Sequence, residues 1–395
     1  MILPDYRQGS IVNLMQSIGA AFGGVGVDAG HGDAGPYGPS ALAPPDAFAA
    51  GRKVVLLVVD GLGYEYLRET VGGGALGEHL RGSLTSVFPS TTATAITTFL
   101  TGCAPQQHGL TGWYMWFREI GTVAAPLPFT TRAGSIPLAG TGVDAHRLFA
   151  SRPFSDRLDT RCFIVQRRDL VESHYTRAFR GKAEVRGYRS LQGFFDVTRD
   201  IVQRHDSCFV YGYWPQLDSM CHGFGAGHDR SREHLRQIDG RFAGFLDAIR
   251  GSGTTVVLTA DHGFVDTTPE TRLELANHPR LADTLVLPLC GEGRAAYCYV
   301  DPAKRGLFES YVEEELGACC TAVTKETMLA DGYFGLGEPN PRLGERIGHY
   351  ALLMKDNFVI RDRLMGEGER PVHVGVHGGT SRAEMLVPLV VAHPL

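Results

Sequence analysis

The hydrophobic pattern is clearest between Val54 and Val59, where six apolar residues follow one another without a polar interruption. A run of this kind is typical of a strand that is buried on both faces, as in a sheet covered by helices on either side. Asp60 ends the run, and Gly61 and Gly63 follow it. We therefore predict a short central strand with a carboxylate at its C-terminal end, where open α/β sheets place their ligands.

Strand-like and helical patterns alternate along much of the remaining chain. Apolar runs of strand length predict further strands at 84–88, 161–166, 208–214, 254–259, 285–289, 296–300 and 350–354. Helical periodicity and helix-ending residues predict helices at 11–22, 64–70, 90–101, 191–205, 228–249 and 304–316. The alternation indicates an α/β fold with a mostly parallel central sheet and helices on both faces.

Two stretches interrupt this alternation. Residues 23–51 are rich in Gly, Ala, Pro and Asp, so we expect residues 1–50 to form an N-terminal wrap around a main domain at 51–395. An aromatic cluster and many turn-forming residues occur at about 112–190, and we interpret this region as a cap or insertion over the sheet edge.

Composition and charge narrow the possible partners. The 395 residues carry a formal net charge of −5 without a dense basic block, which argues against a nucleic-acid scaffold as partner. The first residues lack a cationic lead into an apolar core, and no apolar run approaches membrane-spanning length. We therefore expect a cytoplasmic protein that does not engage a membrane. The eight scattered cysteines are expected to be buried free thiols, and a secreted, disulfide-bonded form is the alternative.

The junction that follows the predicted strand at 84–88 concentrates hydroxyl groups. Ser90, Thr91, Thr92 and Thr94 all fall in the first turn of the predicted helix. Free backbone N–H groups and the positive end of the helix dipole favour a phosphate or a developing alkoxide there, so a nucleophile would be well placed. The alternative is that Ser90 caps the helix while the threonines pack or hydrogen-bond back to it.

Carboxylates and imidazoles follow several of the predicted strands. Asp218 and His222 come after the strand at 208–214, and Asp261 and His262 come directly after the strand at 254–259. His377 lies among glycines that allow close backbone approach. With Asp60 these residues make three carboxylates and three imidazoles, a ligand mixture that suits zinc best, with manganese or iron as other occupants.

The order of these motifs resembles the alkaline phosphatase superfamily, in particular its type I phosphodiesterase/nucleotide pyrophosphatase branch. The resemblance runs from Val54 to the C-terminus and implies a three-layer α/β sandwich with a cap insertion. It also implies two Zn²⁺ ions, with Mn²⁺ as an alternative, and it assigns the ligands by position. One ion would be held by Asp218, His222 and His377, and the other by Asp60, Asp261 and His262.

The same resemblance implies a nucleophile and a reaction. The family spacing phenylalanine-proline-x-x-threonine selects Thr92 over Thr91, and Thr92 would bridge toward the second ion. The implied activity is metal-dependent hydrolysis of phosphodiester or nucleotide pyrophosphate bonds through a phosphothreonine intermediate. The implied partner is a small-molecule phosphate ester, a class that includes nucleotides.

One position departs from the family pattern. The phosphodiesterases have an asparagine that contacts the phosphoryl oxygens after a histidine-glycine pair, and aligning His108-Gly109 with that pair places Trp113 there. Trp113 is therefore a candidate substrate-binding residue that could stack on a nucleobase, and packing in the core is the alternative.

Other activities share the same ligand set. A phosphomonoesterase or phosphonate hydrolase would use the same metals, and a metal-binding pseudoenzyme would keep them without turnover. Sulfatase activity is disfavoured because Thr92 cannot be converted to the aldehyde that this branch requires, and the phosphosugar mutases resemble the chain less.

Overall fold

The computed structural model describes residues 1–23, 36–49, 52–364, 367 and 372–394. Among these residues, the largest sheet has seven strands in the order β2-β18-β9-β1-β8-β6-β7. Their bounds are β1 Lys53–Val59, β2 Leu80–Thr85, β6 Cys162–Arg167, β7 Glu184–Tyr188, β8 Cys208–Trp214, β9 Thr254–Thr259 and β18 Leu386–Ala392. The strand that ends before Asp60 is the middle strand, as predicted.

The central sheet is mostly parallel. Strand β1 runs parallel to β8 and β9, and β6 runs parallel to β8 and β7. Strand β18 is antiparallel to both of its neighbours, β9 and β2. The carboxyl ends of the parallel strands therefore meet at one edge of the sheet, which is the edge that receives the predicted site residues.

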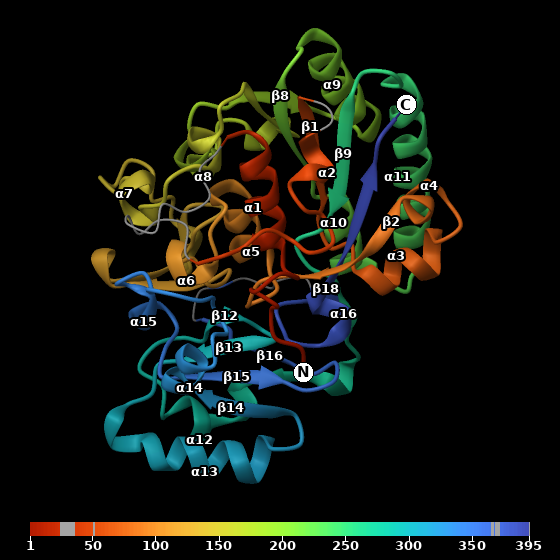
Figure 1. Ribbon diagram of the computed structural model, residues 1–395. Helices are drawn as coiled ribbons and strands as arrows, with labels where there is room; N and C mark the ends of the chain where they lie inside the picture. Colours follow the sequence, from red (N-terminus) through yellow and green to blue (C-terminus); the bar gives the residue numbers. More distant parts are fainter. Residues whose placement is uncertain (24–35, 50–51, 365–366, 368–371, 395) are drawn as a thin grey trace.

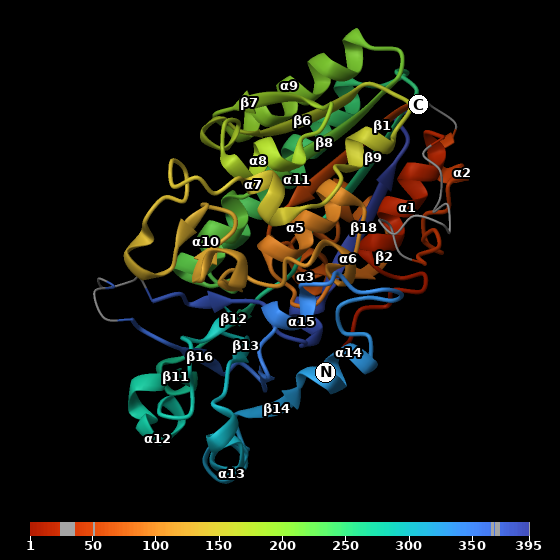
Figure 2. The same cartoon turned by 90° about the vertical axis from the view of Figure 1, so that its left-hand side faces the viewer.

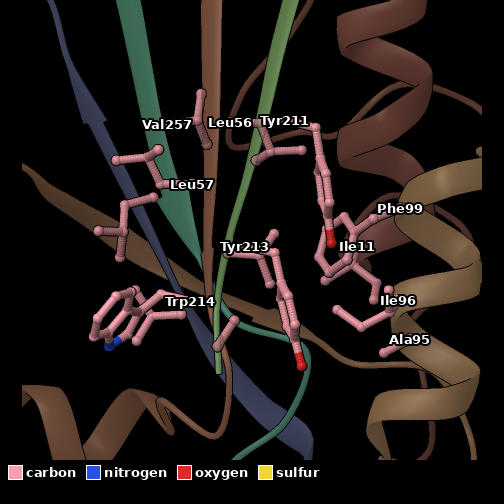
Figure 3. Close-up of a cluster of buried hydrophobic side chains, with 14 of the residues drawn as sticks. Ile11, Leu56, Leu57, Ala95, Ile96, Phe99, Tyr211, Tyr213, Trp214 and Val257 are labelled. Carbon is pink, nitrogen blue, oxygen red and sulfur yellow. The ribbon is translucent and has the colours of Figure 1, made fainter. Parts of the chain in front are cut away.

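Helices cover both faces of this sheet (Figures 1 and 2). Along β8, Tyr211 and Tyr213 point toward Ile96 and Phe99 of α5, whereas Trp214 lies on the opposite side (Figure 3). On that opposite side the Trp214 ring lies 5.8 Å from the ring of Phe194 in α9. Helix α1 packs beside α5, and α11 packs beside α9 and α3. The bounds of these helices are α1 Ile11–Ala21, α3 Tyr64–Val71, α5 Thr92–Thr101, α9 Leu191–Arg204 and α11 Asp229–Ala248.

A second lobe lies beneath the sheet edge (Figure 1). It is a four-stranded antiparallel sheet in the order β12-β13-β15-β14, and it has its own apolar core around residues such as Phe308 and Leu352. Its elements are α12 Pro279–Ala282, β12 Cys290–Glu292, β13 Ala295–Cys298, α13 Arg305–Leu316, β14 Cys320–Thr324, α14 Lys325–Ala330 and β15 Tyr350–Met354. The sequence pattern did not separate this lobe from the central sheet, because its strands and helix continue the same alternation.

Shorter elements complete the structure. A three-stranded sheet is formed by β3 Met115–Phe117, β4 Thr122–Ala125 and β5 Thr130–Thr131. Two-stranded sheets pair β10 Val265–Asp266 with β17 Gly375–Val376 and β11 Arg272–Glu274 with β16 Val359–Arg361. The remaining helices are α2 Asp46–Ala49, α4 Ala75–Glu78, α6 Pro105–His108, α7 Ala145–Phe149, α8 His174–Phe179, α10 Gln216–Phe224, α15 Leu343–Arg346 and α16 Arg382–Met385.

The structure corrects the extent of the predicted cap. Strands β6 and β7 fall within 112–190 but belong to the central sheet, so the inserted part ends earlier. The pattern missed β7 because it is an edge strand, where Glu184 and Arg186 face solvent. The strand predicted at 285–289 is reduced to an isolated bridge between Leu285 and Val300.

The N-terminal region is more deeply packed than a surface wrap. In α1, the buried residues include Ile11, Leu14 and Ile18, which belong to the main core. Residues 24–35 and 50–51 of the expected wrap lie outside the described residues, and the division at residue 50 stays a prediction. Among the described residues, no helix has both the length and the apolar character needed to cross a membrane. Buried free thiols, as expected, include Cys162, Cys208, Cys221, Cys290, Cys298 and Cys320, whereas Cys319 is a free thiol that is only partly buried.

Candidate active site

The six predicted ligand residues come together at the carboxyl edge of the central sheet. Asp60 directly follows β1, and Asp261 and His262 directly follow β9. Asp218 and His222 lie one turn apart on α10, which begins two residues after β8. His377 directly follows β17, which pairs with β10 beyond His262. Two strand ends of the central sheet, helix α10 and the end of β17 therefore supply the side chains.

The first group consists of Asp60, Asp261 and His262, all fully buried. The Nε2 atom of His262 lies 3.3 Å from Oδ1 of Asp60 and 3.5 Å from Oδ2 of Asp261. It also lies 3.2 Å from Oγ1 of Thr92. The predicted nucleophile therefore reaches the point on which these three ligands converge.

The second group consists of Asp218, His222 and His377. Oδ1 of Asp218 lies 3.3 Å from Nε2 of His222 and 3.9 Å from Nε2 of His377, and the two Nε2 atoms are 3.2 Å apart. Asp218 and His377 also lie within ligand distance of His262, whose ring stacks on His377 with centroids 3.7 Å apart. The two groups are therefore neighbours and form one continuous ligand cluster.

Hydrogen bonds fix the tautomer of each histidine. Nδ1 of His222 lies 2.8 Å from the carbonyl oxygen of Gly375, and Nδ1 of His262 lies 3.1 Å from that of Gly263. Nδ1 of His377 lies 3.3 Å from the carbonyl oxygen of Ser90. A carbonyl oxygen only accepts, so each Nδ1 carries a proton, and in the neutral form of each ring the bare Nε2 faces the cluster.

The carboxylates complete a set of unpartnered acceptors. Oδ1 of Asp60, Oδ1 of Asp218 and Oδ2 of Asp261 are buried and accept no hydrogen bond from the described residues. Bare imidazole nitrogens and carboxylate oxygens crowded within 4 Å of one another repel unless a cation lies between them. Carbonyl-oriented histidines beside carboxylates are the ligand arrangement of zinc and related divalent metals, so the residues fit such a site.

The pKa values reflect this crowding of acceptors. Burial and then the neighbouring Asp218 raise the pKa of Asp60 well above its usual value, and burial and then Asp60 do the same for Asp261. Burial lowers the pKa of His222, but the Asp218 carboxylate outweighs it and raises that pKa to about 9. For His377, burial and the other two imidazoles lower the pKa well below its usual value. A divalent cation in the cluster would favour the deprotonated form of every one of these groups.

The nucleophile helix begins one residue later than predicted. Thr91, not Ser90, is the N-cap residue of α5, and neither caps the helix through its side chain. The Ser90 hydroxyl instead donates to the carbonyl oxygen of Gly379, 2.8 Å away, and so ties the start of α5 to the loop that follows His377. Thr92 is the first helical residue, where backbone N–H groups lack a partner within the helix.

Two cavities open beside Thr92. One has a volume of about 370 Å³ and is lined by residues of the second lobe together with His222 and His377. The other has a volume of about 300 Å³ and is lined mainly by apolar and aromatic residues such as Ile96, Leu170 and Tyr175. Thr92, Asp218 and Trp113 line both cavities. The Trp113 side chain is partly exposed at this boundary rather than buried in the core, and its substrate-binding role stays a prediction.

Several residues that support the site were not predicted. The Tyr213 hydroxyl donates to Oδ2 of Asp60, and its position at the end of β8 is a signal that could have found it. Glu292 of β12 accepts hydrogen bonds from the Thr91 hydroxyl and the Trp113 backbone. Glu384 of α16 accepts from the backbone N–H of Gly379 at 2.8 Å. The two glutamates are far from the nucleophile in sequence, and no local motif marks them.

Comparisons with known proteins agree with this geometry. The sequence model of the family described as type I phosphodiesterase / nucleotide pyrophosphatase matches residues 54–379. Among curated protein sequences, none matches the chain.

Similar solved structures support the same fold. The chain is similar to human ectonucleotide pyrophosphatase / phosphodiesterase 5, at 16% identity and a TM-score of 0.64 over 87% of this chain and 88% of that one. The murine form gives 14% identity and a TM-score of 0.62 over the same shares. Phosphonoacetate hydrolase from Sinorhizobium meliloti 1021, in complex with phosphonoformate, gives 17% identity and a TM-score of 0.61 over 87% and 91%.

The family match covers most of the chain, including the strand before Asp60 and the loop of His377. The fold of the solved structures is the three-layer α/β sandwich described above. The chain is therefore a phosphoric ester hydrolase, and it belongs to the type I phosphodiesterase/nucleotide pyrophosphatase family of the alkaline phosphatase superfamily.

Proposed function

We propose that this protein is a metal-dependent phosphodiesterase or nucleotide pyrophosphatase that works through a phosphothreonine intermediate on Thr92. The observation that carries the proposal is the position of the Thr92 hydroxyl, 3.2 Å from Nε2 of His262 within the buried ligand cluster and at the first residue of α5. A hydroxyl there lies beside both a cation site and unpaired backbone donors, which is the environment that a nucleophile toward phosphorus needs.

The ligand cluster is proposed to hold two Zn²⁺ ions, with Mn²⁺ as the alternative. Asp218, His222 and His377 would hold one ion. Asp60, Asp261 and His262 would hold the other, with Thr92 bridging toward it. When bound, the ions lower the pKa of a coordinated hydroxyl and neutralise negative charge on the reacting phosphate. The chain holds these ligands in place through Tyr213 and through the carbonyl oxygens that fix the imidazoles.

The reaction is proposed as a double displacement. The Thr92 oxygen attacks phosphorus and forms a P–O bond, while the bond from phosphorus to the leaving oxygen breaks and that oxygen departs with the electron pair. Water then attacks the phosphothreonine, releases the second product and restores the hydroxyl. The backbone N–H groups at the start of α5, which lack partners within the helix, would donate to the phosphoryl oxygens and stabilise their charge in both steps.

The two cavities support a substrate with substituents on both sides of phosphorus. The more apolar cavity, with Tyr175 and Leu170, suits an organic group, and the partly exposed Trp113 could stack on a base at its mouth. An inactive threonine-to-alanine variant of the murine structural relative has been solved in complex with AMP, which supports a nucleotide as substrate. Phosphonate hydrolysis is the second candidate, because the similar Sinorhizobium enzyme is a phosphonoacetate hydrolase.

The test is steady-state hydrolysis of a diester, a monoester and a nucleotide ester by zinc-loaded protein. We expect bis-p-nitrophenyl phosphate and thymidine 5′-monophospho-p-nitrophenyl ester to turn over faster than p-nitrophenyl phosphate. Thr92→Ala should keep the fold and the bound metal, measured by metal analysis, and lose at least about a thousandfold in kcat, as expected when a nucleophile is removed. Thr91→Ala is the matched control, because it tests whether Thr91 rather than Thr92 is the nucleophile.

Other results would redirect the proposal. Full activity of Thr92→Ala would reject the nucleophile, and a preference for the monoester would favour a phosphomonoesterase. If the metal-loaded protein hydrolyses none of the esters and no phosphonoacetate, the result would favour a metal-binding pseudoenzyme.

We also propose a cytoplasmic location. The support is the set of buried free thiols named above, which a reducing compartment would preserve. Mass spectrometry after thiol alkylation of the native-source protein tests this, because a disulfide-bonded form would take up fewer labels before reduction than after it.

A further inference from the structure

Glu292 brings a carboxyl group from the second lobe to the nucleophile. It ends strand β12, on the hairpin that faces the central sheet. Its Oε1 accepts a hydrogen bond from the hydroxyl of Thr91 at 2.6 Å and another from the backbone N–H of Trp113 at 2.8 Å. Thr91 directly precedes the proposed nucleophile, and Trp113 is the proposed substrate-binding residue.

The second carboxyl oxygen of Glu292, Oε2, remains available to a ligand in the cavity. Within the described residues Oε2 makes no hydrogen bond, and Glu292 is only partly buried because it lines the cavity shared with Thr92, His222 and His377. The side chain is also confined from behind, since a Cβ atom at Gly378 would lie 2.6 Å from the Cβ of Glu292. Glu292 is therefore a fixed carboxyl group that faces the space next to the nucleophile.

The arginines that line this cavity are engaged elsewhere. Arg132 lies 3.4 Å from Asp362 and 3.7 Å from Glu367, and it stacks 4.7 Å from the Tyr114 ring. Arg272 donates to the Thr267 hydroxyl at 2.9 Å, and Arg361 lies 3.8 Å from Glu274. The group held directly beside the start of α5 is thus an acid, at a place where an enzyme for doubly charged phosphates would need a further positive charge.

We propose that Glu292 is a specificity-determining residue that favours singly charged phosphodiesters over doubly charged monoesters and phosphonates. The inference rests on the proposed diesterase function and identifies the charge state of its substrate. A diester carries one negative charge on its phosphoryl group, and a monoester carries two near neutral pH. A carboxylate beside the reacting group repels the second charge, and rejection of this kind is as effective for specificity as a favourable contact.

The charge of Glu292 is controlled by its surroundings. Burial raises the pKa of its carboxyl group to about 7, although the hydrogen bonds from Thr91 and Trp113 lower it. Assays at about pH 9 therefore compare an ionised carboxylate with a neutral replacement.

The variant Glu292→Gln tests the proposal because its amide oxygen can still accept from Thr91 and Trp113. The substrates are methyl p-nitrophenyl phosphate and p-nitrophenyl phosphate, which share a leaving group and differ by one charge. We expect kcat/KM for the diester to stay within about threefold and kcat/KM for the monoester to rise about tenfold or more, since one like-charge contact in a partly desolvated site is worth at least that factor. Glu313→Gln, on the exposed side of α13 in the same lobe, is the matched control and should leave the ratio unchanged.

An unchanged ratio of the two kcat/KM values would overturn the proposal, and if both values fall equally, the role of Glu292 is purely structural. A binding measurement separates this from failure of the proposed function. In the Thr92→Ala background, calorimetry with p-nitrophenyl phosphate should show about tenfold tighter binding when Glu292→Gln is added, whether or not the wild-type protein hydrolyses either ester. Equal affinity of Thr92→Ala and Thr92→Ala/Glu292→Gln for p-nitrophenyl phosphate would reject the role of Glu292 independently of turnover.

Discussion

A buried ion pair joins the second lobe to the loop of His377, and its removal gives a quantitative test of the structure. Arg294 of the β12–β13 hairpin donates to both carboxylate oxygens of Glu384, at 3.0 and 2.7 Å. The exposed fractions of the two side chains are 1% and 0%. Glu384 also accepts from the N–H of Gly379, two residues after His377. The pair therefore supports both the contact between lobes and the backbone next to a proposed ligand.

The variant Glu384→Gln removes the negative charge and keeps an oxygen that can accept from Gly379. Arg294 is then buried without a counter-charge, and breaking a buried pair in this way costs about 3–5 kcal/mol. Nη1 of Arg294 keeps its bonds to the carbonyl oxygens of Lys355 and Phe358. These bonds are unaffected by the substitution, so we expect a loss near the lower limit, about 3 kcal/mol in the free energy of unfolding.

Urea unfolding followed by circular dichroism measures this loss, and a double-mutant cycle isolates the ion pair. Arg294→Met and the double variant Arg294→Met/Glu384→Gln complete the cycle. We expect the free energy of unfolding of the double variant to exceed the value predicted by adding the two single losses by about 2 kcal/mol or more. The reason is that the double variant leaves no unpaired buried charge. A loss below about 1 kcal/mol for Glu384→Gln, or additive single changes, would show that the pair is not buried and coupled as described.

Two further predictions concern the ligand cluster and the pH dependence of stability. Tyr213→Phe removes the hydroxyl that donates to Oδ2 of Asp60, and we expect metal affinity to fall about 10- to 100-fold, as measured by competition with a chelator; an unchanged affinity would contradict the supporting role of Tyr213. His108 is buried, and burial followed by the charge of Arg346 lowers its pKa to about 3. Since the unfolded chain binds this proton near pH 6.5, stability should fall by about 1.4 kcal/mol per pH unit from about 6.5 downward relative to His108→Gln, as measured by urea unfolding at pH 7 and pH 5; parallel pH profiles would refute this.

The sequence was sufficient to predict the central strand and the ligand cluster. Asp60 and Asp261 follow buried parallel strands and Asp218 lies on the helix that comes after a third one, and parallel strands bring their carboxyl ends to one edge. Local sequence order therefore specified a three-dimensional cluster. The helix after the strand was also predicted, although α5 begins at Thr92, one residue later than expected, and the choice of Thr92 as nucleophile stays a prediction.

The remaining features depend on contacts between distant segments. Ser90 was expected to cap α5, but its hydroxyl finds an acceptor at Gly379, which no local pattern could show. Glu292 reaches Thr91 only because the second lobe folds against the sheet edge. Strand β7 carries exposed charged residues and lacks the apolar run by which buried strands are recognised. Tertiary contacts decided these positions, and local propensity did not.

The position of β18 has a consequence for biosynthesis. This strand, residues 386–392, lies between β2 and β9 and separates two strands that are made much earlier. A ribosome-bound chain that has exposed only residues up to β15 therefore presents unpaired edges on both β2 and β9, and unpaired edges promote association with other chains. His377 is also made after β15, so the nascent protein completes its sheet and its ligand cluster within the same short interval. Termination of synthesis after His377 but before β18 begins at Leu386 would release a chain that has the ligand residues but an open sheet, and such a chain is prone to associate with others.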